Sequence, residues 1–509
     1  METKIIVKKS NESYVKIECD RSTAQELSDY FTFYVPGYQF TPAFRNKIWD
    51  GKIRLFDQRS NELYHGLYSL IETFASERDY SVEYKDPRPD LVDDFSEYLA
   101  DKYIQQLNAH SRGKKLTVDS HQRTAFIHAM RKRRCLLLSP TASGKSLIMY
   151  MIVRQLLDYH CKKGLIIVPR TSLVEQLYSD FADYSSENGW DVSNTIHKIY
   201  QGKEKTTQLP LIITTWQSIY QFPKEYFEQF DFVIGDEAHL FKSQSLTSIL
   251  TKCINAKYRV GLTGSLDGTK THKLVLEGLF GLAERVATTK ELMDKNRLAD
   301  FEIKCLVLKH DDEICELMKK TTYQEEIEYL ILNEIRNKFI KNLAASLKGN
   351  TLILYQYVDK HGKILYDLIT NTKNIGVRKV FFIYGKTDVE TRENVRSITE
   401  QEENAIIIAS YGTFSTGINI RNLHNVIFAS PSKSRVRNLQ SIGRALRIGE
   451  KKEKAILYDI ADDLRYKNYM NHTLKHFVER TKLYNEEKFV YKLYKIGLKN
   501  GKSSSNQVV

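Results

Sequence analysis

The sequence predicts an α/β protein built from two tandem domains, each with a parallel β-sheet covered by helices. Short apolar runs alternate with helical stretches, as buried parallel strands do in such domains. The series then starts again near residue 300, and 509 residues are too many for one compact core. The first series is CLLLSP, GLIIVPR, LIITTW, DFVIGDEAH and RVGLTGS, and the second is EIKCLVLK, NTLILYQ, KVFFIYG, AIIIASYG and NVIFASP.

Two shorter pieces flank these domains. The runs KIIVKK, YVKIEC and KIRLFD predict strands of a small N-terminal α+β domain. The segment KDPRPDLVDD (85–94) follows it, and its two prolines exclude a helix or a central strand there. The stretch from Leu464 to Lys502 is helical in pattern and rich in Lys and Tyr. We therefore expect an N-terminal domain at 1–88, α/β domains at 89–295 and 296–462, and a helical basic extension at 463–509.

The composition indicates the cellular compartment and the type of partner, but it does not decide the function. The net charge of +13 suits an anionic partner such as nucleic acid or an acidic membrane, and equally suits a merely basic protein. No run of about 18 apolar residues predicts a membrane span. The start lacks a signal-peptide core, and six scattered cysteines suit a reducing compartment. We expect a cytoplasmic protein that does not contact a membrane.

The segment LLLSPTASGKS (136–146) is similar to a phosphate-binding loop, although Ser139 stands where that pattern has its leading glycine. An apolar run precedes it and a helical period follows, as such a loop requires. Lys145 would pair with the β- and γ-phosphates, and Ser146 would offer its hydroxyl to Mg²⁺. On the loop alone, a nucleotide site and a coincidental strand–turn–helix are about equally plausible. The candidate phosphate cradle is Ser139, Thr141, Ser143, Gly144, Lys145 and Ser146.

Two adjacent carboxylates end the apolar run DFVIGDEAH. A magnesium nucleotide needs a carboxylate at a strand end to hold the metal and a second group to orient the attacking water. Asp236 suits the first task and Glu237 the second. An Asp-Glu pair that merely caps a helix is the alternative if the pair stands alone.

The pair does not stand alone, because DEAH (236–239) resembles motif II of the superfamily 2 helicases, and other motifs follow in that family's order. The resemblance covers roughly residues 116–460 and implies two RecA-like domains that use ATP and Mg²⁺. Departures are Thr263-Gly264-Ser265, where the family often has Ser-Ala-Thr, and Asn419, where it often has Asp. The matching segments are Gln122 for the adenine-reading glutamine, 168–176 for motif Ia, 214–218 for Ic, 262–266 for III, 352–361 for IV, 411–420 for V and 440–447 for VI.

The resemblance also implies roles for individual residues. Gln122 would read adenine, and Gly417 of motif V would lie at the nucleotide. Arg444 and Arg447 of motif VI, with Gln440 beside them, would reach the γ-phosphate and stabilise the charge of the transferred group. Motifs Ia, Ic, IV and V would contact the phosphates of one nucleic-acid strand, which carry little sequence information. Those contacts would come from Arg170, Thr171, Thr215, Gln217 and Thr416.

The N-terminal segment FTPAFRNKIWDGKIRLFD (40–57) interleaves basic and aromatic residues. Cations bind a phosphate backbone, and aromatic rings stack on bases or wedge at a junction. An amphipathic hairpin with a solvent-facing basic side explains the pattern equally well; members of the family often carry a substrate-reading domain here, which favours DNA. The candidate contacts are Arg45, Lys47, Trp49, Lys52 and Arg54.

The function implied by the resemblance is an ATP-dependent DNA helicase or translocase of recombination, repair and replication. Its substrates would be branched DNA, including forks, Holliday junctions, D-loops and R-loops, so single-stranded DNA and RNA–DNA hybrids are expected partners of a monomer. An RNA helicase is the nearest alternative, because the shared motifs do not report 2′-hydroxyl recognition. A double-strand translocase without strand separation and a non-hydrolysing scaffold are the others.

Overall fold

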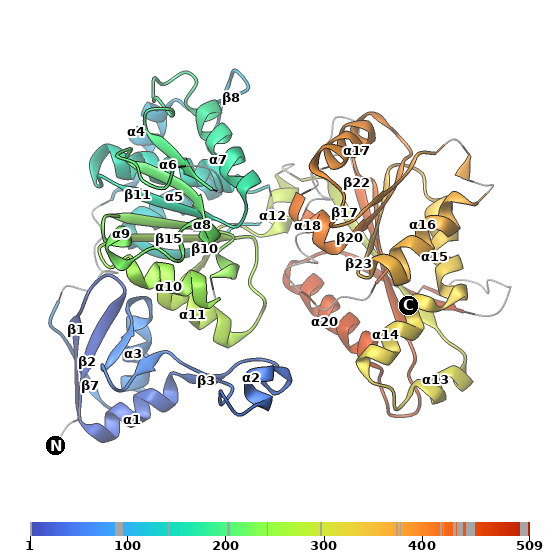
Figure 1. Ribbon diagram of the computed structural model, residues 1–509, viewed down its shortest axis with the longest axis horizontal. Helices are drawn as coiled ribbons and strands as arrows, with labels where there is room; N and C mark the ends of the chain where they lie inside the picture. Colours follow the sequence, from blue (N-terminus) through green and yellow to red (C-terminus); the bar gives the residue numbers. More distant parts are fainter. Residues whose placement is uncertain are drawn as a thin grey trace. The chain divides into compact units, whose positions relative to one another are not determined.

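The chain forms two compact units, Met1–Ala287 and Thr288–Val509, which are described separately (Figure 1). The four-part division into 1–88, 89–295, 296–462 and 463–509 stays a prediction, and most of the proline-containing segment expected between the first two parts lies outside the described residues. The computed structural model describes residues 3–86, 95–140, 142–200, 204–241, 243–295, 298–372, 375–376, 378–417, 420, 422–430, 434, 441–443, 454–498 and 507–508.

The first unit begins with a small α+β domain, as predicted. Its five-stranded sheet has the order β5-β6-β2-β1-β7, in which β1 pairs antiparallel with β2 and parallel with β7. Alternation along β1 buries Ile5 and Val7 on one face. The elements are β1 Lys4–Lys9, β2 Tyr14–Glu18, α1 Arg21–Tyr30, β5 Phe56–Asp57, β6 Glu62–Tyr64, η2 His65–Leu67, α3 Tyr68–Ser76 and β7 Ser81–Tyr84.

A projecting segment, residues 32–54, leaves this domain and is called the arm below. Strands β3 (Thr32–Tyr34) and β4 (Lys52–Arg54) pair antiparallel at its base. Between them lie η1 (Tyr38–Phe40) and the short helix α2 (Pro42–Arg45), which extend away from the five-stranded sheet in Figure 1.

The first α/β domain contains a fully parallel seven-stranded sheet of order β12-β13-β11-β14-β15-β10-β16. The five apolar runs of the first series form its central strands, because near-continuous apolar sequence suits strands buried on both faces. Helices cover the sheet on both sides (Figure 1). The strands are β10 Arg134–Leu138, β11 Gly164–Val168, β12 Ile196–Ile199, β13 Leu211–Thr215, β14 Phe232–Asp236, β15 Tyr258–Thr263 and β16 Ala283–Arg285.

The two faces of this sheet belong to different hydrophobic cores. One core joins the sheet to α4, α5, α6 and α7. The other joins it to α10, α11 and the N-terminal domain, so that domain is continuous with the first α/β domain. The helices are α4 Glu97–Leu107, α5 Ser120–Lys132, α6 Lys145–Tyr159, α7 Thr171–Tyr184, α8 Trp216–Ile219, α9 Lys224–Glu228, α10 Gln244–Lys252 and α11 Lys270–Phe280.

Two glycines permit this junction. A Cβ at Gly66 of η2 would overlap the carbonyl oxygen of Glu277 in α11. A Cβ at Gly278 would lie 2.9 Å from the Cβ of Tyr64. The two backbones therefore touch directly, which fixes the N-terminal domain on α11.

The second unit contains the second predicted α/β domain. Its sheet has the order β19-β20-β18-β21-β22-β17-β23-β24, parallel except for the β23–β24 pair. The strands are β17 Asp300–Lys309, β18 Thr351–Tyr355, β19 Val380–Ile383, β20 Ile406–Ser410, β21 Asn425–Phe428, β22 Lys454–Asp463, β23 Tyr491–Gly497 and β24 Gln507–Val508. Its longer helices are α14 Tyr323–Leu332, α15 Glu334–Ser346, α16 Lys363–Thr370, α17 Val389–Gln401 and α20 His472–Glu486.

The C-terminal extension is helical in α20, as the sequence predicts, and then differs. Residues Tyr491–Gly497 form β23, which pairs with β17 and extends the sheet. The run YKLYKIG places apolar residues at short intervals that a strand accommodates as readily as a helix. α20 is fixed by a buried ion pair in which the Arg480 guanidinium donates to the Asp459 carboxylate of β22 at 2.8 Å.

Within the described parts of the chain, we find no helix with the length and apolar character needed to cross a bilayer.

Candidate functional site

The predicted phosphate loop joins β10 to α6, the strand–loop–helix arrangement that such a site requires. Gly144 is the N-cap of α6 in the left-handed region (φ 77°), and Lys145 is the first helical residue. Ser139 is fully buried, and its hydroxyl oxygen lies 2.5 Å from that of Ser143. The Ser143 hydroxyl donates to the Pro140 carbonyl at 2.7 Å. Ser139 therefore braces the loop from inside, which accounts for a hydroxyl residue at the position of the leading glycine.

Gln122 lies against this loop. Its Oε1 accepts from the Asp119 backbone N–H at 2.9 Å in a capping box of α5, and its Nε2 donates to the Ser143 carbonyl at 3.0 Å. The amide keeps one N–H and one lone pair, which is the set that pairs with an adenine edge. Gly144 has φ 77°, which strains any other residue, and a Cβ there would also displace Gln122 Nε2 from the loop.

The carboxylate pair follows β14 and faces the loop lysine. Lys145 Nζ lies 3.3 Å from Glu237 Oε1. The Glu237 backbone N–H donates to Asp236 Oδ1 at 2.9 Å. Glu237 has φ 50°, a left-handed conformation that costs a non-glycine residue about 1–3 kcal/mol and is typical of functional sites. The structure thus brings Lys145, Asp236 and Glu237 together, as predicted.

Burial and charge separate the pKa values of these two carboxyls. Burial raises the pKa of Asp236 more than the Lys145 ammonium lowers it, to about 6. Burial also raises the pKa of Glu237, but Lys145 and His239 lower it further, and the net pKa lies below its usual value. Glu237 is therefore the more firmly ionised member of the pair.

His239 connects the carboxylates to motif III, a link that we did not predict. Its Nδ1 lies 3.0 Å from the Thr263 hydroxyl oxygen and 3.3 Å from Glu237 Oε2. The Thr263 hydroxyl donates to the Ser265 carbonyl at 3.1 Å, so the histidine ring N–H is the donor in the first contact. The sequence signal that could have indicated this link is the histidine at the fourth position of DEAH, which is His239. A Cβ at Gly264 would lie 3.8 Å from the Ser139 carbonyl oxygen, an ordinary van der Waals contact, so the structure does not require glycine there.

Ser146 has a partner that no sequence signal identifies. Its hydroxyl oxygen lies 2.9 Å from the Tyr184 hydroxyl at the end of α7. Burial raises the pKa of Tyr184 to about 12, so the phenol stays protonated and can donate to Ser146. This contact leaves the Ser146 oxygen a lone pair for a cation. Thr141 lies outside the described residues.

Four of the residues predicted to contact the nucleic-acid strand line one cavity of about 740 Å³. Arg170 and Thr171 follow β11, Thr215 ends β13 and Gln217 lies in the first turn of α8. These strands are parallel neighbours with Val168 opposite Thr215, so both loops leave the same sheet edge. The cavity is also lined by residues outside any motif: Tyr200, Lys205, Gln221 and Phe222.

The predicted residues of the second unit are less completely described. Thr416 and Gly417 end α18 (Tyr411–Gly417), directly after β20. Gln440, Arg444 and Arg447 lie outside the described residues, and their roles stay predictions.

In the arm, the residues predicted to contact DNA differ in their exposure and in their partners. Arg45 and Lys47 are exposed, and Arg54 pairs with Asp50 at 2.5 Å. The Trp49 indole N–H donates to the Lys52 carbonyl at 2.9 Å, which holds that ring within the arm. The most exposed apolar residues of the arm are instead Phe40 (73% exposed) and Ile48 (79%), which the sequence analysis missed because exposure is not encoded locally.

Comparisons with known proteins agree with this geometry. Three family models match in order: "DNA helicase UvsW, N-terminal" at 4–85, "Type III restriction enzyme, res subunit" at 98–267 and "Helicase conserved C-terminal domain" at 334–449. The ATP-dependent DNA helicase uvsW of Enterobacteria phage T4 is 35% identical over 503 residues, covering 96% of this chain and 98% of that protein. The chain belongs to the UvsW family of DNA helicases.

Solved structures support the family's fold across the whole chain. The crystal structure of T4 UvsW is 34% identical, covers 98% of this chain and 100% of its own, and has a TM-score of 0.52. A fragment of a putative HsdR subunit of a type I restriction enzyme from Vibrio vulnificus is 16% identical over 86% of this chain and 75% of its own, with a TM-score of 0.56. The second likeness shows the fold alone. The helicase fold of the UvsW family, with two RecA-like domains, is confirmed.

Proposed function

We propose that this UvsW-family chain is an ATP-dependent helicase that acts on branched DNA, including forks, four-way junctions, displacement loops and R-loops. The observation that carries the branched-DNA part is the arm, which exposes apolar and basic side chains together on the domain that precedes the ATP-binding core. The T4 relative is named as an ATP-dependent DNA helicase. We propose action as a monomer in the cytoplasm of the host cell if the chain is viral.

Hydrolysis would use the loop and the carboxylate pair. Lys145 would leave Glu237 to bind the β- and γ-phosphates, and Glu237 would then orient the attacking water. Gln122 would pair with adenine while the backbone of Ser139–Ser146 surrounds the phosphates. Gly417, Gln440, Arg444 and Arg447 are proposed to complete the nucleotide contacts.

The residues present fit Mg²⁺. Ser146 and Asp236 offer one hydroxyl and one carboxylate, and Mg²⁺ usually takes one or two protein oxygens together with phosphates and water. Consistent with a metal that arrives with its nucleotide, the described residues contain no group of three or more His, Cys, Asp or Glu side chains placed to hold a metal. When bound, the ion would neutralise charge on the phosphates.

One DNA strand would lie along the 740 Å³ cavity. Arg170 would pair with a phosphate, while Thr171, Thr215 and Gln217 would donate hydrogen bonds to the backbone. Thr416 is proposed as a contact from the second α/β domain. Lys205 and Phe222 add a cation and a ring, with the ammonium 5.6 Å from the ring centre. Such a pair suits a phosphate beside an unpaired base.

The arm would bind at a branch point. Arg45, Lys47, Lys52 and Arg54 would contact phosphates, and Phe40 and Ile48 would pack against unpaired or unstacking bases. Trp49, held by its hydrogen bond to Lys52, would support the arm instead of stacking on DNA. RNA–DNA hybrids are included because a branch point, not a sequence, is what the arm would recognise.

The test is ATP hydrolysis by the full chain with no nucleic acid, single-stranded DNA, a four-way DNA junction or single-stranded RNA. Lys145→Ala should abolish hydrolysis in every condition and still bind DNA. Phe40→Ser with Ile48→Ser should lower junction-stimulated hydrolysis about fivefold or more, since one lost base contact is worth about 1–3 kcal/mol. Hydrolysis with single-stranded DNA should stay unchanged. Tyr98→Ser with Leu317→Ser is the matched control, because both residues are 73% exposed outside the arm.

The same experiment separates the alternatives. Stimulation by RNA alone would make the chain an RNA helicase. Hydrolysis and movement on intact duplex without strand separation would make it a double-strand translocase. A chain that hydrolyses ATP in no condition would be a binding scaffold.

A further inference from the structure

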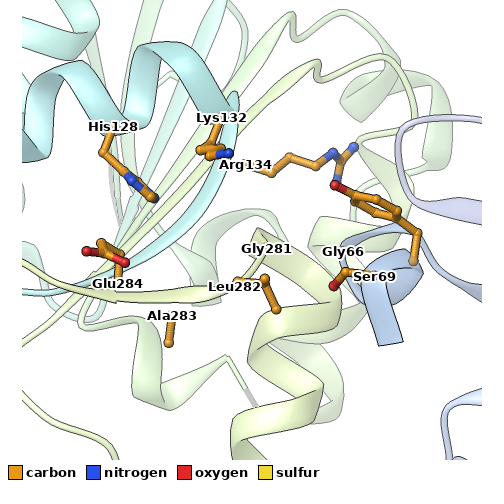
Figure 2. Close-up of a pocket in the computed structure, with 10 residues that line it drawn as sticks. Gly66, Ser69, His128, Lys132, Arg134, Gly281, Leu282, Ala283 and Glu284 are labelled. Atoms are coloured by element: carbon orange, nitrogen blue, oxygen red, sulfur yellow. The ribbon is translucent and has the colours of Figure 1, made fainter. Parts of the chain in front are cut away.

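A second cavity, of about 310 Å³, lies at the junction of the N-terminal domain and the first α/β domain (Figure 2). Gly66 and Ser69 line it from η2 and α3. Lys132 at the end of α5, Arg134 at the start of β10 and the segment from Gly281 to Glu284 line it from the other side. None of these residues belongs to the proposed nucleotide site or to the proposed site for the nucleic-acid strand.

Arg134 places a buried positive charge in the wall of this cavity. Its side chain is 4% exposed, and Nη2 donates to the Glu12 carboxylate at 2.9 Å and to the Glu12 carbonyl. Among the described residues, Nη1 of this guanidinium has no hydrogen-bond partner. A buried charged donor without an acceptor is costly, and a nearby anion would lower that cost through its charge.

The surroundings of Arg134 carry excess positive charge. Arg259 is its direct neighbour across β10 and β15 and is 1% exposed. The hydrogen bonds that Arg259 makes within the described structure go to neutral oxygens, those of Ser13 and of the Leu250, Cys253 and Ala256 carbonyls. Burial and the charge of Arg134 lower the pKa of Arg259 to about 9. Two buried guanidinium groups thus share one carboxylate, that of Glu12, and an added anion would balance them.

The opposite end of the cavity offers different chemistry. Figure 2 shows His128 and Glu284 facing each other across the far side from Ser69. Burial lowers the pKa of His128 more than Glu284 raises it, so the imidazole is neutral near pH 7. A carboxylate and a neutral imidazole accept hydrogen bonds from hydroxyl or amine groups.

We propose that this cavity binds a small molecule that bears a phosphate or carboxylate group. The oxyanion would lie beside the Lys132 ammonium and close to the buried positive charge of Arg134, and a hydroxyl or amine of the ligand would face Glu284 and His128. The volume suits a small metabolite and is at the lower end of ligand pockets.

The walls are already in place for such a ligand. Gly66 lies against the Glu277 carbonyl, and Gly281 has φ 114° with its Cβ position 2.6 Å from the Arg134 carbonyl oxygen. Both glycines bring backbone to the cavity edge where a side chain would clash. A ligand would bridge the N-terminal domain to β10, the strand that leads into the phosphate loop, and would therefore stabilise that junction.

The test uses the full chain carrying Lys145→Ala, so that phosphate binding at the ATP loop is weakened. Inorganic phosphate, pyrophosphate and succinate are titrated by calorimetry, and the Tm is followed in parallel at constant ionic strength. At least one probe should bind saturably with a Kd below about 1 mM and raise the Tm. Ser69→Phe should abolish binding by filling the cavity, and Lys132→Gln should weaken it about tenfold. Lys115→Gln, which removes an exposed lysine elsewhere in the same unit, should change nothing.

The pattern of binding would identify the chemical class of the ligand. Binding of phosphate or pyrophosphate but not succinate would identify a phosphorylated ligand, and the reverse a carboxylate. Absence of saturable binding by all three probes would overturn the proposal, as would equal binding by the Ser69→Phe variant. If Ser69→Phe fails to fold, the comparison of Lys132→Gln with Lys115→Gln decides, because both lysines are exposed and neither change disturbs a core.

Discussion

Replacing Glu12 with glutamine should destabilise the first unit by a predictable amount. Glu12 and Arg134 form an ion pair at 2.9 Å with side chains 10% and 4% exposed, and Lys9 adds a second contact at 2.6 Å. Removing one partner of a buried pair costs about 3–5 kcal/mol because the remaining charge is left without compensation. Here the loss would leave both Arg134 and Arg259 without a buried carboxylate.

The expected change in Tm follows from the size of the unit. Unfolding entropy of about 2.1 cal/mol/K per residue gives about 600 cal/mol/K for the unit Met1–Ala287, so the loss corresponds to about 5–8 °C. Differential scanning calorimetry of the full chain measures it. Glu18→Gln is the matched control, since its pair with Lys8 at 2.7 Å is more than 40% exposed on both sides and should leave the Tm unchanged. Equal shifts for the two variants would refute the reasoning.

The effect should also depend on pH with a defined sign. Burial raises the pKa of Glu12, but Arg134 and Lys9 lower it more, and the folded pKa lies below the usual value of 4.5. A depressed folded pKa contributes stability above the unfolded pKa, and that contribution is lost as the pH falls through the folded pKa. The difference in Tm between wild type and Glu12→Gln should therefore be full at pH 7 and shrink below about pH 4.5.

Three other outcomes are expected. Gly144→Ala should weaken binding of a fluorescent ATP analogue, because φ 77° is strained for alanine and the new Cβ would displace Gln122, whereas Gly264→Ala should bind normally, since its Cβ would make only an ordinary van der Waals contact. Affinity for the magnesium nucleotide should fall as the pH drops through about 6, because the raised pKa of Asp236 keeps it protonated there; an Asp236→Asn variant that retained the same pH profile would exclude this cause. His239→Ala should lower DNA-stimulated hydrolysis about tenfold with little change in nucleotide affinity, by steady-state and binding assays, and unchanged hydrolysis would show that the link to Thr263 is dispensable.

The elements that local pattern specifies were predictable from the sequence. Apolar runs such as GLIIVPR and DFVIGDEAH form central strands, because a strand that is buried on both faces is recognised from a nearly continuous apolar sequence. The meeting of Arg170 with Thr215 was predictable too, since parallel strands deliver their following loops to one sheet edge.

Contacts between distant parts of the chain were not predictable in this way. Glu12 meets Arg134 from 122 positions away, and Ser13 meets Arg259 from 246. Single buried charges have no period to reveal them, and their partners depend on how the N-terminal domain packs on α10 and α11. The same limit applies to Trp49, whose hydrogen bond to the Lys52 carbonyl depends on the turn of the arm.

These distant contacts place the N-terminal domain at the starts of two strands whose ends carry the chemistry. β10 begins at Arg134 and leads into the phosphate loop, and β15 begins at Arg259 and ends at Thr263, which His239 connects to Glu237. A physical route thus exists from Glu12 to the proposed catalytic carboxylate, but contiguity alone does not show that it carries free energy. A double-mutant cycle with Glu12→Gln and His239→Ala, scored by DNA-stimulated hydrolysis, measures it. An interaction energy above about 0.5 kcal/mol would show coupling between the two sites, and additive effects would mean that the strands only hold both sites in place.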